Sequence, residues 1–130
     1  MDFNFSEEQQ LLADTLQRFV REHYTFEKRR EILQSSGGWS REMWDQIAGL
    51  GVTAINVPEE HGGLGGGPVE TMLVMNALGE GLVLEPYLAA AVLTPALLTR
   101  LGDANAAADL LPAVASGERI VIVAHQEPNT

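Results

Sequence analysis

The stretch SEEQQLLADTLQRFV, which occupies residues 6–20, decides the fold class of this chain. Ser6 is followed three residues later by Gln9, the spacing of a helix N-cap with a capping box, and the two acids between them favour the positive end of a helix dipole. Leucine, phenylalanine and valine side chains then recur at helical spacing. The sequence therefore predicts an amphipathic helix over residues 7–23.

Similar signals recur along the rest of the chain. They predict further helices at residues 26–33, 40–50, 68–84, 87–98 and 103–111. The segment 87–98 is apolar on every side, which predicts a helix buried all round, and Pro95 must kink it or divide it. Pro112 is expected to begin a separate last turn.

Two segments are predicted to be extended. Val52–Val57 ends at Pro58, and the residue before a proline avoids the helical conformation. Ile120–Ala124 is a β-branched run without helical period, which predicts one strand near residues 119–125. The predicted fold is all-α, an orthogonal bundle of about five or six helices with one short C-terminal β-strand.

A glycine-rich loop precedes the helix at 68–84, with five glycines among residues 62–67. The Walker pattern of a phosphate loop needs a lysine followed by serine or threonine, and both are missing. The dinucleotide fingerprint fails as well, because its third glycine falls on Pro68. We therefore predict a turn in which the backbone passes close to another segment, with Pro68 as the first residue of the next helix.

Composition excludes several classes of function. The 130 residues contain no cysteine, so disulfides and thiolate chemistry are excluded, and no stretch approaches the roughly 20 apolar residues of a membrane span. The net charge is -10, and residues 42–130 contain eleven acids against Arg100 and Arg119. Nucleic acid and anionic membranes are therefore poor partners. The acidic, polar N-terminus is not a secretory signal, so the expected location is cytoplasmic.

The residues give no local catalytic constellation. His23, His61 and His125 lie far apart in the sequence, and no second histidine lies near His61 to complete a metal site. We expect no metal and assign no catalytic residue. From the chemistry of its residues alone, the chain is a helical domain in which we identify no catalytic residues.

The order of several short motifs is more specific than any one of them. The set consists of Met1-Asp2-Phe3 leading into Ser6-Glu7-Glu8-Gln9, Trp44 with Leu50-Gly51, Val57-Pro58-Glu59-Glu60-His61-Gly62-Gly63-Leu64-Gly65, Leu78-Gly79, Leu110-Leu111-Pro112, Ser116-Gly117-Glu118 and Glu127-Pro128. In this order it resembles the N-terminal α-domain of acyl-CoA dehydrogenases over essentially the whole chain. Two further segments, 65–70 and 84–88, resemble the small-subunit branch typified by pimeloyl-CoA dehydrogenase.

The resemblance implies a division into an N-terminal helical domain, residues 1–118, and the first strand of a middle β-domain, residues 119–130. Members of the family bind FAD and desaturate an acyl-CoA thioester at its α and β carbons. Their base is usually a glutamate of a C-terminal bundle, so this chain alone is expected to be inactive and to bind FAD weakly or not at all.

The resemblance also implies site residues. The acyl chain of the family runs beside the helix that matches residues 87–98, which predicts Tyr87, Ala90, Ala91 and Thr94 as substrate-binding residues. The small side chains among them are equally typical of close helix packing, and the sequence leaves both interpretations open.

The flavin of the family lies near a Thr-Glu-Pro motif, which here reads Gln126-Glu127-Pro128. The predicted cofactor-binding residues are therefore Val123, His125 and Gln126, and Gln126 replaces the usual threonine hydroxyl. The implied partners are acyl-CoA, an electron-transfer flavoprotein as acceptor, and further acyl-CoA dehydrogenase subunits in a homo- or hetero-oligomer. The alternative function is a stand-alone helical interaction module or a non-catalytic partner subunit.

Overall fold

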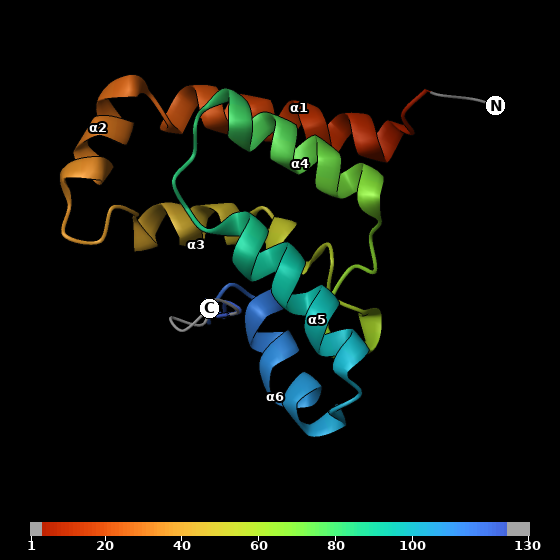
Figure 1. The fold of residues 1–130 in the computed structure, drawn as a ribbon. Helices are drawn as coiled ribbons and strands as arrows, with labels where there is room; N and C mark the ends of the chain where they lie inside the picture. The colour runs from red at the N-terminus through yellow and green to blue at the C-terminus, as the bar shows by residue number, and fades with distance from the viewer. Residues whose placement is uncertain (1–3, 125–130) are drawn as a thin grey trace, which may run out of the picture. The chain divides into compact units, whose positions relative to one another are not determined.

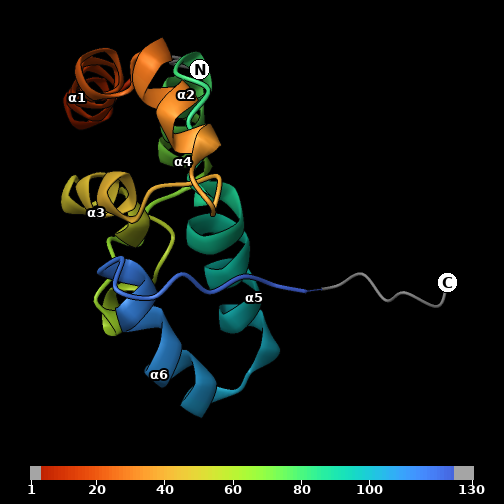
Figure 2. The ribbon, with the colours of Figure 1, turned by 90° about the vertical axis from the view of Figure 1, so that its left-hand side faces the viewer.

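The computed structural model describes residues 4–124, and its regular structure in this range is helical. The elements are α1 (Glu7–His23), α2 (Phe26–Gln34), α3 (Arg41–Gly49), the 3₁₀ turns η1 (Val52–Ala54) and η2 (Glu59–His61), α4 (Pro68–Glu80), the π-helical η3 (Leu88–Leu93), α5 (Thr94–Leu101) and α6 (Ala104–Ala115), as drawn in Figures 1 and 2. The predicted all-helical composition is confirmed for this range.

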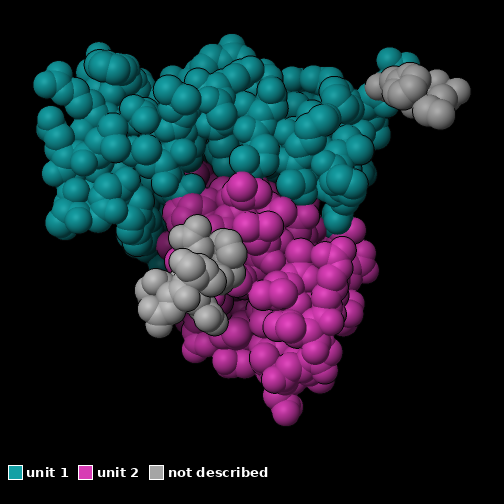
Figure 3. Space-filling view, viewed as in Figure 1, with its two compact units in different colours: residues 1–46, 66–85 teal, residues 47–65, 86–130 magenta. Residues whose placement is uncertain are grey.

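The chain divides into two compact units, which Figure 3 colours separately. Unit 1 comprises residues 1–46 and 66–85, and unit 2 comprises residues 47–65 and 86–130. Each unit is built from two stretches of chain that are far apart in the sequence.

Unit 1 is organised by α1 and α4, which pack along each other. At their first turns, Gln9 Nε2 donates a 2.7 Å hydrogen bond to Glu70 Oε1. At their other ends, Gly81 passes so close to Val20 that there is no room for a Cβ at position 81. Both pairs are 61 positions apart, so the two helices run parallel and in one register.

The capping box predicted for α1 is confirmed, and α4 begins at Pro68 as predicted. Ser6 Oγ accepts a hydrogen bond from Gln9 N at 3.2 Å, and Gln9 Oε1 accepts one from Ser6 N at 3.0 Å. On α4, Pro68 is the first helical residue and Glu70 Oε2 accepts from Gly67 N at 2.9 Å. The hydrogen bond from Gln9, followed by the backbone hydrogen bonds at the cap, lowers the pKa of Glu70.

Unit 2 is organised by α6, which packs against α5, η1, η2 and η3. One buried apolar cluster of unit 2 joins α6 to η1 and to the segment that follows η1; it consists of Ala54, Val57, Ala107, Leu111, Val114 and Ala115, with Leu98 and Val121 packed against it. Thr53 lies fully buried beside this cluster, and its Oγ1 donates to the carbonyl of Ala115 at 2.8 Å. Asp103 caps α6 by accepting from the backbone N–H groups of Asn105 and Ala106.

Three sequence predictions about local structure are wrong. Residues 52–57 are compact, because Gly51 at φ 80° starts the η1 turn and the Ala54 carbonyl accepts from Leu64 N at 2.9 Å. Pro112 stays inside α6, where its missing N–H would have bonded the carbonyl of Ala108, a residue that solvent reaches. α4 ends at Glu80, four residues before the predicted end.

The predicted strand is not found in residues 119–124. A strand requires a hydrogen-bonded neighbour, and the Val121 carbonyl instead accepts a 2.7 Å hydrogen bond from Thr94 Oγ1. The remainder of the predicted strand lies outside the described residues.

Candidate functional site

The predicted substrate-binding residues lie together in unit 2, along η3 and the start of α5. All four are buried: Tyr87 and Thr94 are 2% exposed, and Ala90 and Ala91 are fully enclosed. Tyr87 donates from its hydroxyl to the Val52 carbonyl at 3.1 Å, and desolvation raises its pKa. This environment agrees with close helix packing, and an acyl-binding role for these residues stays a prediction.

The opposite side of the same segment is exposed. Leu88, Leu93 and Leu97 are 48%, 53% and 38% exposed, so the prediction of a segment buried on every side is wrong. An apolar sequence indicates only that burial is favourable. The packed elements of unit 2 cover one side and leave this leucine side uncovered.

Pro95 explains the π-helical turn that precedes it. A proline has no N–H, so the Ala91 carbonyl, four residues earlier, lacks its α-helical donor. Asn56 Nδ2 donates to this carbonyl at 3.2 Å from the other stretch of unit 2. The helix is π-helical at Leu88–Leu93 and continues as α5 from Thr94. The sequence analysis did not identify Asn56. Pro95 nevertheless indicates that the Ala91 carbonyl needs a hydrogen-bond donor other than the backbone of residue 95.

Thr94 links the predicted substrate residues to the predicted cofactor residues. Its Oγ1 lies 3.0 Å from the Ala89 carbonyl and 2.7 Å from the Val121 carbonyl, and its single proton is donated to one of them at a time. Val123, two residues beyond Val121, is 39% exposed. His125 and Gln126 lie outside the described residues.

We expect that replacing Asn56 with alanine lowers the free energy of unfolding by about 1–2 kcal/mol, because the Ala91 carbonyl loses its donor. Replacing Asn56 with aspartate should cost more, since a carboxylate would then face a carbonyl oxygen. Urea denaturation measures both, and Asn105→Ala at the exposed start of α6 is the control. An Asn56→Asp variant as stable as the parent chain would contradict this role.

The described residues fit only part of a flavin site. Ile122 and Val123 are exposed and lie outside any helix, so this segment could contact one edge of a flavin ring. A pyrophosphate needs converging donors, and the two arginines of unit 2 do not supply them. Arg119 pairs with Asp109 at 3.4 Å, and Arg100 lies near the end of α5.

A buried carboxylate is a further feature that the sequence analysis missed. Glu85, in unit 1, is 5% exposed, and its Oε1 accepts from Ser40 N at 3.0 Å, just before α3. Its Oε2 has no hydrogen-bond partner within residues 4–124. The Tyr24 hydroxyl accepts from Leu84 N at 2.8 Å, and desolvation, with a contribution from the Glu85 charge, raises the pKa of Tyr24.

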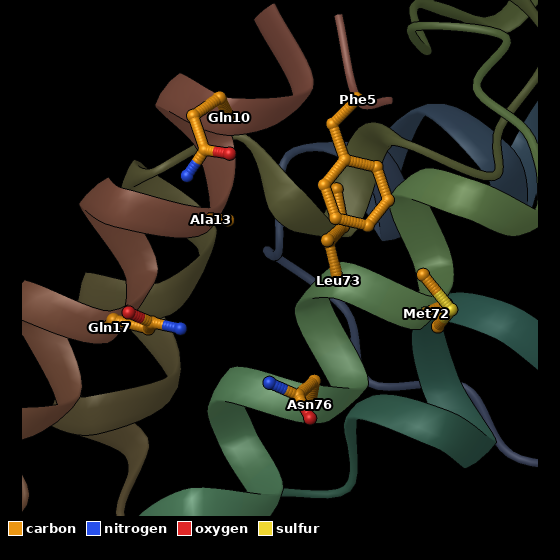
Figure 4. Close-up of a pocket in the computed structure, with 7 residues that line it drawn as sticks. All are labelled: Phe5, Gln10, Ala13, Gln17, Met72, Leu73 and Asn76. Carbon is orange, nitrogen blue, oxygen red and sulfur yellow. The ribbon is translucent and has the colours of Figure 1, made fainter. Parts of the chain in front are cut away.

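Each unit has a surface cavity. The cavity in unit 1, of about 330 Å³, lies between α1 and α4 and is lined by Phe5, Gln10, Ala13, Gln17, Met72, Leu73 and Asn76, which Figure 4 shows. The cavity in unit 2, of about 200 Å³, is lined by residues that include His61 of η2, Leu98 of α5 and Asp103 just before α6. The carboxylate of Asp103 is occupied as the helix cap.

Residues 4–124 contain neither a membrane-spanning helix nor a metal-binding cluster. No helix in this range is long and apolar enough to cross a membrane. No three histidine, aspartate or glutamate side chains in the same range are grouped as a metal ion would require.

Comparison with known proteins places the chain in a family. Residues 6–118 match the family model "Acyl-CoA dehydrogenase, N-terminal domain". The chain is 33% identical over 124 residues to acyl-CoA dehydrogenase FadE27 of Mycobacterium tuberculosis, covering 95% of the chain and 33% of that protein. It is 38% identical over 127 residues to mitochondrial isovaleryl-CoA dehydrogenase of Pongo abelii, covering 95% of the chain and 30% of that protein.

A solved structure agrees with these matches. The crystal structure of the ChsE4-ChsE5 complex from Mycobacterium tuberculosis superposes with a TM-score of 0.88 and 32% identity, covering 100% of this chain and 36% of the matched one. The chain therefore spans about a third of the length of these relatives. With the family match, the helical architecture and the ordered motifs in agreement, this chain belongs to the acyl-CoA dehydrogenase family and corresponds to its N-terminal domain.

Proposed function

We propose that the chain acts as the N-terminal domain of a flavin-dependent acyl-CoA dehydrogenase, which forms a double bond between the α and β carbons of an acyl-CoA thioester. The observation that carries the proposal is the family match over residues 6–118, together with relatives that are acyl-CoA dehydrogenases. The chain's own contribution is to the wall of the acyl pocket and to one edge of the flavin site.

The proposed contribution centres on the junction of η3 and α5. Thr94 holds the Val121 carbonyl at 2.7 Å and so keeps the segment before Val123 beside the predicted acyl helix. Asn56 holds the π-helical turn through Ala91. FAD, when bound, supplies the acceptor for the hydride from the β carbon. We assign no catalytic base to this chain, because the resemblance places that group in a C-terminal bundle.

We propose further that the working protein is an oligomer of acyl-CoA dehydrogenase subunits, with an electron-transfer flavoprotein as acceptor. The support for a hetero-oligomer is that a close structural match is a complex of two different proteins, ChsE4 and ChsE5. The support for a homo-oligomer is the family match alone.

The test uses the native protein purified from its source with any tightly bound subunits. We expect yellow flavin absorbance, and reduction of ferrocenium that depends on added acyl-CoA and is measured across a range of acyl chains. The isolated 130-residue chain is the comparison, and we expect it to show no turnover and no micromolar FAD binding by flavin fluorescence. A native protein without flavin and without acyl-CoA-dependent reduction would support the interaction-module alternative and overturn the proposal.

A further inference from the structure

The cavity between α1 and α4 combines an apolar floor with carboxamide side chains. Ala13 and Leu73 are buried at its base, and Phe5 and Met72 are 45% and 51% exposed at its side. Three carboxamides, those of Gln10, Gln17 and Asn76, complete the lining, and no lining side chain carries a charge. In a chain of net charge -10, this uncharged cavity favours an uncharged ligand that has both polar and apolar groups.

Neighbouring charges fix the direction of two of these carboxamides. Gln10 Nε2 donates to Asp14 Oδ1 at 2.9 Å, which leaves Gln10 Oε1 as an acceptor. Gln17 Oε1 accepts from Arg21 at 3.2 Å, which leaves Gln17 Nε2 as a donor. Figure 4 shows this oxygen and this nitrogen turned toward the side of the cavity that α4 forms.

Along α1, the cavity therefore has a hydrogen-bond acceptor at Gln10 and a hydrogen-bond donor two helical turns later at Gln17. Residues 10 and 17 lie about 10 Å apart along the axis of α1. About three residues of extended peptide span the same distance. Such a segment would give an N–H to Gln10 Oε1 and a carbonyl to Gln17 Nε2 if it runs in the same direction as α1.

Asn76 lies across the cavity on α4 and offers a third carboxamide. Within residues 4–124 its side chain makes no hydrogen bond, so both its donor and its acceptor face solvent or a ligand. An extended peptide has donors and acceptors on both edges, so Asn76 can serve the second edge. The apolar floor between the helices suits one aliphatic side chain.

We propose that this cavity binds an uncharged, extended peptide segment of a partner protein, about three residues long, with an aliphatic residue seated over Ala13 and Leu73. The proposal goes beyond the dehydrogenase function and does not depend on it. The partial charges of the carboxamides select the direction of the peptide, and the apolar floor selects its central side chain.

The test is a titration of the ¹⁵N-labelled chain with the capped, uncharged peptide acetyl-alanyl-leucyl-alanine amide, followed by ¹H–¹⁵N correlation spectra. We expect saturable movement of the side-chain NH₂ signals of Gln17 and Asn76, with a dissociation constant of about 1 mM. Acetyl-triglycine amide should bind at least about 5-fold more weakly, because it has no side chain for the apolar floor.

Two variants separate the site from a general effect of charge. Gln17→Glu removes the donor while its carboxylate still pairs with Arg21, so the fold is retained and binding should weaken by about 3- to 10-fold. Gln34→Glu adds the same charge at the exposed end of α2 and should leave binding unchanged.

Three outcomes would overturn the proposal. The first is the absence of saturable movement at about 10 mM peptide, which is well above the expected dissociation constant. The second is equal binding by the parent chain and Gln17→Glu. The third is movement of the same signals on raising the protein concentration without peptide, which would assign the cavity to a second copy of the chain.

Discussion

Replacing Gly63 with alanine is expected to lower the free energy of unfolding by at least about 3 kcal/mol. A Cβ at position 63 would collide with the carbonyl group and the Cβ of Val57. The colliding atoms belong mainly to the backbone, so no rotamer change relieves the overlap. Val57 is fully buried in the core beneath α6, which leaves the backbone no room to retreat.

Urea denaturation of the variant measures this cost. Gly49→Ala is the matched control in the same unit, because a Cβ at Gly49 meets no atom within 4 Å and this glycine closes α3. The control should be neutral or more stable by about 0.5–1 kcal/mol. A Gly63→Ala variant with the stability of the parent would show that the loop does not pack on Val57 as described.

The result bears on what the glycine-rich loop does. Two of its N–H groups bond to the segment just before the loop: Gly63 N donates to the Pro58 carbonyl at 3.1 Å, and Gly65 N donates to the Val57 carbonyl at 3.0 Å. These groups are therefore not available to cradle a phosphate. Gly63 therefore allows close packing. This agrees with the prediction of a turn in which the backbone passes close to another segment.

Features set by neighbouring residues could be predicted from the sequence. Ser6 caps α1 as the sequence predicts, Asp103 caps α6, and the glycines at 51 and 102 adopt positive φ angles just beyond α3 and α5. Each of these depends on a side chain or a backbone conformation within four residues of the helix end. The family resemblance, which rested on an ordered set of short motifs, is confirmed as well.

Features that need a distant partner could not be predicted. The residue that serves the Ala91 carbonyl is Asn56, 35 positions away, and no periodic pattern connects the two. The cavity of unit 1 was missed for the same reason, because its lining joins α1 to α4 across about sixty residues. The seven-residue spacing of Gln10 and Gln17 was visible, but on a single helix it indicates only a shared face.

The second large effect is expected at the contact of α1 with α4. Gly81 has an ordinary φ of -86°, so alanine fits its backbone, and the cost of Gly81→Ala comes from collision with Val20 Cγ1. We expect a loss of about 2 kcal/mol in the free energy of unfolding. Val20→Ala alone should also cost about 2 kcal/mol, because a buried side chain loses two methyl groups.

The double variant Val20→Ala/Gly81→Ala tests the contact directly, because removing the valine methyl groups makes room for the new Cβ. It should be more stable than the sum of the single losses predicts by at least about 1.5 kcal/mol. Gly79→Ala, whose Cβ meets no atom within 4 Å, should instead add to Val20→Ala without coupling. Strict additivity in both pairs would mean that α1 and α4 do not share this register. The carboxamides of Gln17 and Asn76 would then not face one cavity, so this double-mutant cycle also tests the foundation of the proposed peptide site.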